Sequence, residues 1–173
     1  MNPSSDTPRS FRIDKKALGV LQSEARRQRV TLSSIVNKLI TSYVEYGRFA
    51  EQAHAISLSQ YTFSLLLNAI GDEDLIAAAE RAGKSASGFV KAVHGRLTLL
   101  EIRRFISDLS AHANMFGFNE GRSIEGSHMV LLHELGPKWS LFLSHYIGEL
   151  FASAKLQVRT EISDRSVTFW PQT

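Results

Sequence analysis

The chain has 173 residues, with 20 Lys and Arg against 17 Asp and Glu, which gives a formal net charge of +3. This length suits one domain or two small ones, and a hydrophobic content of 43% is ample for a folded core. The absence of cysteine excludes disulfides, thiolate metal sites and cysteine nucleophiles. No apolar run approaches the roughly 18–20 residues of a membrane span, and no signal peptide is predicted, so we expect a cytoplasmic protein without membrane contact.

The positive charge is concentrated at the N-terminal end. Residues 1–49 hold nine basic and four acidic side chains, a formal charge of +5, whereas the remainder holds eleven basic and thirteen acidic ones. This asymmetry favours a basic nucleic-acid-binding head on a near-neutral body. A solvated basic surface on an ordinary helix pair would give the same count, so charge alone leaves both interpretations open.

The first elements are an arm and a short strand. Residues 1–8 are polar and bounded by proline, which predicts a flexible arm. Residues 9–13 then alternate, with Phe11 and Ile13 on one face and Ser10 and Arg12 on the other. This pattern predicts a strand with one apolar face.

Two helices follow the strand. Asp14 is a suitable N-cap for a helix that begins at Lys15 and ends in the basic run 26–29. Thr31 caps a second helix over residues 32–48, whose apolar residues recur at three- and four-residue steps. One strand and two helices in about 40 residues cannot bury these apolar faces alone. The segment therefore predicts a homodimer in which two strands pair antiparallel across a two-fold axis above four helices.

This order of elements resembles the ribbon-helix-helix superfamily of the Arc and MetJ repressors. The matching segments are residues 9–13, the apolar positions Leu18, Leu21 and Ala25, and residues 29–36. The sequence differs from the family at Arg29, where a turn glycine is usual. The resemblance covers residues 9–48, about a quarter of the chain, and implies a dimer that binds double-stranded DNA.

In such a dimer the two-stranded ribbon enters the major groove, where outward side chains meet base edges. The resemblance places Ser10 and Arg12 there, with Arg9 nearby. The capped start of the second helix would offer backbone amides of residues 32–34 and nearby hydroxyls to a phosphate, and surface lysines would add sequence-independent attraction. These further DNA-binding candidates are Lys15, Lys16, Thr31, Ser33, Ser34 and Lys38. The alternative is that Ser10 and Arg12 are only the solvated side of an edge strand.

Residues 57–173 predict a second, larger α+β domain, after a linker or helix extension at 50–56. Helices are expected at 61–67, closed by Gly71, and at 73–81, stopped by Ala82 and Gly83. A third helix is expected after a cap at Ser85, and a fourth at 97–110. The pattern then changes to period two. Strands are expected at 112–119 and 128–135 around a turn at 120–126.

Pro137 begins a long apolar helix, 137–153, and a closing hairpin follows at 156–162 and 166–170. The two hairpins predict a four-stranded antiparallel sheet with helices on one face. This order of elements, with residues 133–140 at its centre, resembles the C-terminal part of uncharacterised archaeal regulators.

Other chemical signals in this domain are weak. Gly83-Lys84-Ser85 resembles the end of a phosphate-binding loop, but Ala78 stands where that loop needs glycine. The histidines lack the spacing of a metal site, so no metal and no cofactor are expected. Lys138 and Trp139, at the start of a helix, are candidates for holding a small anionic effector. The alternative is that Trp139 fills the core and Lys138 is solvated.

We therefore expect a transcriptional regulator that acts as a homodimer and is not an enzyme. Its C-terminal domain would support a higher oligomer or bind a small-molecule effector. One alternative is a DNA-binding antitoxin that grips a partner protein, although residues 57–170 look able to fold alone. Another is an enzyme that uses the ribbon only to dimerise, for which no catalytic constellation is evident.

Overall fold

The computed structural model describes residues 9–52, 54–124 and 126–172, and the chain divides into two compact units, Met1–Ala55 and Ile56–Thr173. The arm predicted at residues 1–8 lies outside the described residues. The described parts combine helices with one antiparallel sheet, which confirms a mixed α+β composition.

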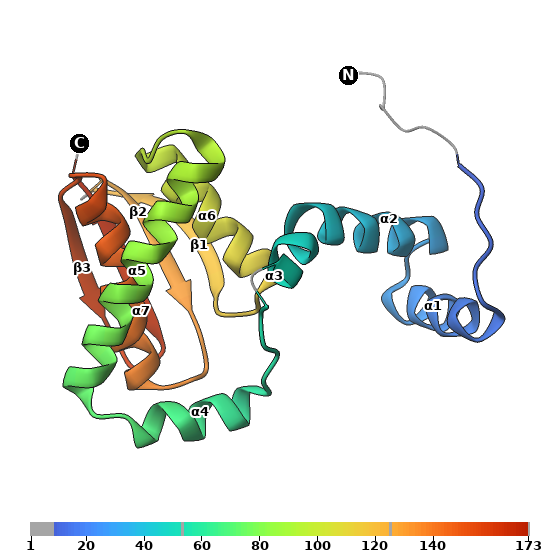
Figure 1. Ribbon diagram of the computed structural model, residues 1–173, viewed down its shortest axis with the longest axis horizontal. Helices are drawn as coiled ribbons and strands as arrows, with labels where there is room; N and C mark the ends of the chain where they lie inside the picture. Colours follow the sequence, from blue (N-terminus) through green and yellow to red (C-terminus); the bar gives the residue numbers. More distant parts are fainter. Residues whose placement is uncertain (1–8, 53, 125, 173) are drawn as a thin grey trace. The chain divides into compact units, whose positions relative to one another are not determined.

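The N-terminal unit begins with two capped helices, α1 (Lys15–Gln28) and α2 (Leu32–Ser42) (Figure 1). The Asp14 carboxylate accepts hydrogen bonds from the amides of Lys16 and Ala17, at 2.9 and 3.0 Å. The Thr31 hydroxyl accepts one from the Ser34 amide at 3.1 Å. Both predicted N-caps are therefore confirmed, and each satisfies amides that no helical carbonyl can reach.

The second helical stretch is longer than predicted. After α2 it passes through a π-helical turn, η1 (Tyr43–Gly47), and continues as α3 (Arg48–Gln52). The helix therefore extends into the 50–56 segment, which is one of the two interpretations predicted for that segment. Gly47 lies within this helical stretch, where a Cβ would be 3.0 Å from Cδ2 of the Tyr43 ring.

The strand predicted at residues 9–13 is not formed in this chain. These residues carry no regular structure, and all but Ile13 are exposed. A strand is defined by hydrogen bonds to a neighbouring strand, and every strand pair of the sheet joins residues of the C-terminal unit. Residues 9–13 of the single chain thus do not form the ribbon of the expected fold.

In residues 56–124 and 126–172, the C-terminal unit contains four helices and four strands. The helices are α4 (Gln60–Ala69), α5 (Asp72–His94), α6 (Leu99–His112) and α7 (Pro137–Ser153). The strands are β1 (Gly117–Ser123), β2 (Gly126–Leu132), β3 (Val158–Ile162) and β4 (Ser166–Pro171). They form one antiparallel sheet in the order β1-β2-β4-β3, as the two predicted hairpins imply.

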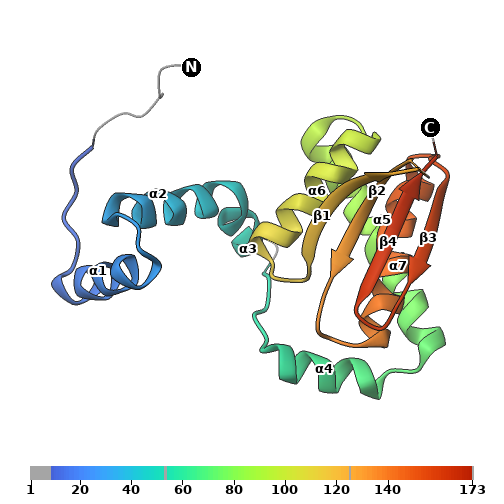
Figure 2. The same ribbon diagram turned by 180° about the vertical axis from the view of Figure 1, so that it is seen from behind.

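The helices lie on one face of this sheet, with the sheet in front of α5 and α7 in Figure 2. Helix α7 packs against both α5 and the strands β3 and β4, and its buried residues include Trp139, Leu143, Ile147 and Phe151. A helix covered on opposite sides must be apolar around most of its circumference, and α7 is. The core is therefore centred on α7.

Two predicted helices in this unit are one. The predicted stop at Ala82-Gly83 and cap at Ser85 are wrong, because α5 runs unbroken from Asp72 to His94. Gly83 is buried against α7, where a Cβ would lie 2.6 Å from the carbonyl oxygen of Tyr146. The glycine therefore permits close helix packing rather than a turn.

The remaining differences concern strand ends. His112 is the last residue of α6, and β1 begins only at Gly117. The predicted turn at 120–126 is mostly strand, since β1 pairs with β2 as far as Ser123–Gly126. β2 ends at Leu132, three residues early, and β3 begins at Val158. Polar and glycine residues on solvated strands gave a false turn signal.

Candidate nucleic-acid interface

The residues predicted to read DNA lie on the surface of the N-terminal unit. Arg9, Ser10 and Arg12 precede α1 and are exposed. Lys15 and Lys16 occupy the first turn of α1, and Lys38 is exposed on α2. All the predicted basic contacts are thus accessible to a polyanion.

The start of α2 is partly occupied by its own cap. The Ser34 amide, predicted to be available to a phosphate, donates to Thr31 Oγ1, and the Thr31 and Ser34 hydroxyl oxygens are 2.8 Å apart. The amides of Leu32 and Ser33 are in the first helical turn, where no intrahelical carbonyl reaches them. A phosphate at this position would therefore meet those two amides and the exposed hydroxyl of Ser33.

Arg29, where the resembling family usually has glycine, lies in the turn between α1 and α2. Arg29 has a left-handed backbone, with φ 56° and ψ 39°, the region that glycine adopts most readily. Its amide donates to the carbonyl of Arg26 at 3.2 Å, and the Val30 amide donates to Ala25 at 3.0 Å. Arg29 therefore forms this turn at the expense of backbone strain.

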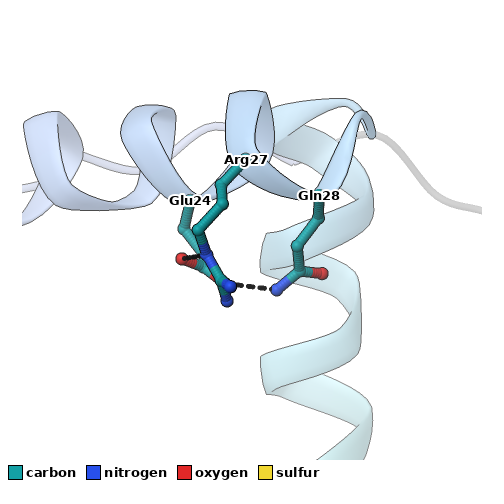
Figure 3. Close-up of polar contacts among 3 residues, drawn as sticks. All are labelled: Glu24, Arg27 and Gln28. Atoms are coloured by element: carbon teal, nitrogen blue, oxygen red, sulfur yellow. Dashed lines mark hydrogen bonds and ion pairs between the residues drawn. The ribbon is translucent and has the colours of Figure 1, made fainter.

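One of the basic residues at the end of α1 is neutralised locally. Arg27 contacts the Glu24 carboxylate through Nε at 2.9 Å and Nη2 at 2.5 Å, and Gln28 donates to the same carboxylate (Figure 3). The hydrogen bond from Arg27, with a further one from Gln28, lowers the pKa of Glu24 to about 2. Sequence counting of charges missed this pairing, although a Glu three residues before an Arg on a helix is a recognised signal.

An apolar surface accompanies these charges. Among residues 9–52 and 54–55, only Ala25 and Ile35 are buried hydrophobic residues. Leu39 is 55% exposed and Phe11 60% exposed, although both lie on the predicted apolar faces. The exposed large hydrophobic residues of this unit, which we call the N-terminal apolar surface, are Phe11, Val20, Val30, Leu39, Ile40, Tyr43 and Val44.

The two effector candidates have structural contacts. Lys138 Nζ donates to the Ile70 carbonyl and lies 3.4 Å from Asp72 Oδ1, which ties α7 to the α4–α5 connection. Trp139 is 2% exposed, stacks on Phe142 at 4.9 Å between ring centroids and donates to the Met115 carbonyl at 3.0 Å. These contacts hold both residues within the fold, and an effector at this segment stays a prediction.

A buried histidine lies close to these two residues. His133 Nε2 is 2.8 Å from the hydroxyl of Ser140, while its Nδ1 has no partner among the described residues. Burial lowers the pKa of His133, because the imidazolium would lose its hydration. His133 also lines a cavity of about 610 Å³ with Leu58, Met115 and Leu135. No three His, Cys, Asp or Glu residues of the described ranges group as metal ligands.

Comparisons add nothing to the identity of the site. None of the helices in residues 9–52, 54–124 and 126–172 combines the length and apolarity of a membrane span. No protein-family model, no curated protein sequence and no solved structure matches this chain.

Proposed function

We propose that the chain is a sequence-specific DNA-binding transcriptional regulator that acts as a homodimer through residues 9–49. The N-terminal apolar surface is the observation that carries this proposal. Seven exposed large hydrophobic residues in so small a unit favour a partner that covers them. A second copy is the economical partner, because a two-fold axis presents the same surface twice.

The unstructured segment 9–13 fits the same arrangement. No backbone hydrogen bond of this segment is found among the described residues, and Phe11 is exposed beside the polar residues Ser10 and Arg12. Antiparallel pairing with the same segment of a second copy would satisfy the backbone and place both Phe11 side chains against the helices. Ser10 and Arg12 would then face outward as a ribbon for the major groove.

The contacts to phosphate follow from the charges around this ribbon. Lys15, Lys16 and Lys38 are exposed, and Leu32 and Ser33 supply backbone amides at a helix start. Arg27 is assigned no role, because Glu24 already neutralises it. The proposal thus assigns contacts with bases to Arg12 and contacts with phosphates to the lysines, and substitutions can distinguish the two roles.

The test compares three variants of the full chain on a duplex selected from random sequences and on a scrambled duplex. Arg12→Ala should weaken binding to the selected duplex by about 1–3 kcal/mol per half-site and barely affect the scrambled one. Lys38→Ala should weaken both duplexes alike and lower the salt slope by about one unit. Arg27→Ala makes the same change in net charge and is the control, expected to preserve the preference for the selected duplex.

Equal losses on both duplexes for Arg12→Ala would refute base reading by the ribbon. The dimer is tested separately by sedimentation of the full chain and of a Leu39→Glu variant. The variant should sediment as a smaller species, because Leu39 belongs to the N-terminal apolar surface. Identical sedimentation of the two proteins would remove this surface as the dimer contact.

A further inference from the structure

A cleft opens at one end of the sheet, where β2 and β4 part. The last cross-strand pair at this end is Met129–Phe169, whereas β2 continues to Gly126 and β4 to Pro171. The space between the parting strands has a volume of about 580 Å³, within the range of small-molecule sites. Its lining residues are Arg122, Gly126, Ser127, Arg159, Trp170, Pro171 and Gln172.

The charged and aromatic groups of this lining are hydrogen-bond donors. Two guanidinium groups, from Arg122 on β1 and Arg159 on β3, flank the cleft, and neither can accept a hydrogen bond. The indole of Trp170 also has only a donor, Nε1. No acidic side chain among the described residues lines the cleft. Such a lining selects a ligand that is rich in acceptors.

An unpaired hydrogen-bond donor on Trp170 indicates a ligand. Its Nε1 is buried and has no hydrogen-bond partner among the described residues. A buried indole donor normally finds an acceptor, and leaving one unpaired is costly. The adjacent His128 ring lies 6.0 Å from the indole by centroids, and its Nδ1 also has no partner among the described residues.

Arg159 lies beside Trp170 and would contact a ligand bound to its Nε1. Its guanidinium lies over the Trp170 ring, 4.0 Å from the centroid, and 2.7 Å from the Glu161 carboxylate. The Arg159 side chain is 43% exposed. An anion in the cleft would compete with Glu161 for Arg159 and at the same time offer an acceptor to Trp170 Nε1.

We propose that this cleft binds a small molecule through a carboxylate or phosphate group, held by Arg122, Arg159 and Trp170 Nε1. Bidentate pairing of guanidinium with either anion supplies the strongest contact. The site lies wholly in the C-terminal unit and involves none of the residues assigned to DNA. Binding here is therefore independent of the proposed function of residues 9–49.

The experiment follows the two indole N–H resonances of the full chain by NMR at constant ionic strength. Inorganic phosphate and malonate are titrated separately against chloride. The Trp170 signal should shift and saturate, while the Trp139 signal, already bonded to the Met115 carbonyl, stays fixed as an internal control of folding. A response to phosphate alone, malonate alone or both assigns the ligand class.

Matched variants locate the binding. Arg122→Gln and Arg159→Gln should each weaken the fitted affinity about tenfold. Arg165→Gln, which removes an exposed arginine at the opposite end of β4, should leave it unchanged. An absence of saturation, equal movement of both indoles, or full affinity in the double variant Arg122→Gln/Arg159→Gln would overturn the proposal. A Trp170 shift caused only by a DNA duplex would overturn it too, in favour of a nucleic-acid contact.

Discussion

Replacement of Gly83 by alanine tests the packing that defines the C-terminal core. A Cβ at this position would lie 2.6 Å from the Tyr146 carbonyl oxygen and 2.7 Å from the Cβ of Glu149. Ordinary contact begins near 3.4 Å, so α5 and α7 would have to separate by about 0.8 Å. Overpacking of this kind costs about 1–3 kcal/mol. Alanine also gains about 1 kcal/mol over glycine in a helix interior, which partly offsets the loss.

Gly88→Ala in the same helix provides the control. Nothing lies within 4 Å of a Cβ at Gly88, so this variant gains only the helix propensity and should be more stable by about 0.5–1 kcal/mol. The two variants share the propensity contribution, and the difference between their free energies of unfolding in urea should therefore be about 1–3 kcal/mol. Equal stabilisation by both substitutions would refute the close approach of α5 and α7.

Three further predictions concern single side chains. Arg29→Gly should raise the free energy of unfolding by about 0.5 kcal/mol, since relief of the left-handed backbone outweighs the added freedom of the unfolded chain, and a lower urea midpoint would contradict this. Ser140→Ala should lower it by about 1–3 kcal/mol by leaving His133 Nε2 unpaired, and an unchanged midpoint would refute the bond. Burial lowers the pKa of His133 in the folded chain below its unfolded value near 6.5, so its contribution is fully present above pH 6.5 and is lost as the pH falls through the folded pKa. The urea midpoint should therefore drop less on acidification in the His133→Gln variant than in the unchanged chain. An equal pH dependence of the midpoint in both proteins would refute the role of His133.

Local signals in the sequence located most elements correctly. Asp14 and Thr31 were recognised as caps because an N-cap depends on one side chain and the next few amides. The α7 bounds, Pro137–Ser153, match the prediction, since proline at the first turn and a continuous apolar pattern mark such a helix. The two hairpins were also recoverable from alternation alone.

The failures depend on contacts between distant residues. Gly83 has the local properties of a helix stop, and only the position of Tyr146 shows why glycine is required there. Likewise, the donor-rich cleft joins Arg122, Arg159 and Trp170, which lie on three strands and share no sequence motif. The segment 9–13 differs again, because its strand would depend on a second chain. Within residues 9–48 the two helices are therefore confirmed, whereas the ribbon stays a prediction.

The strand order β1-β2-β4-β3 has a consequence for the rate at which the C-terminal unit folds. Each hairpin joins neighbouring segments and forms through local contacts, whereas β2 and β4 meet only after residues 133–165 have been folded back. Closing a loop of this length costs about 3 kcal/mol of chain entropy before its contacts can compensate. Helix α7 occupies most of the loop and packs on β3 and β4, so docking it shortens the search. We therefore expect the kinetic barrier to lie at the junction of the two hairpins, with α7 already helical when they join.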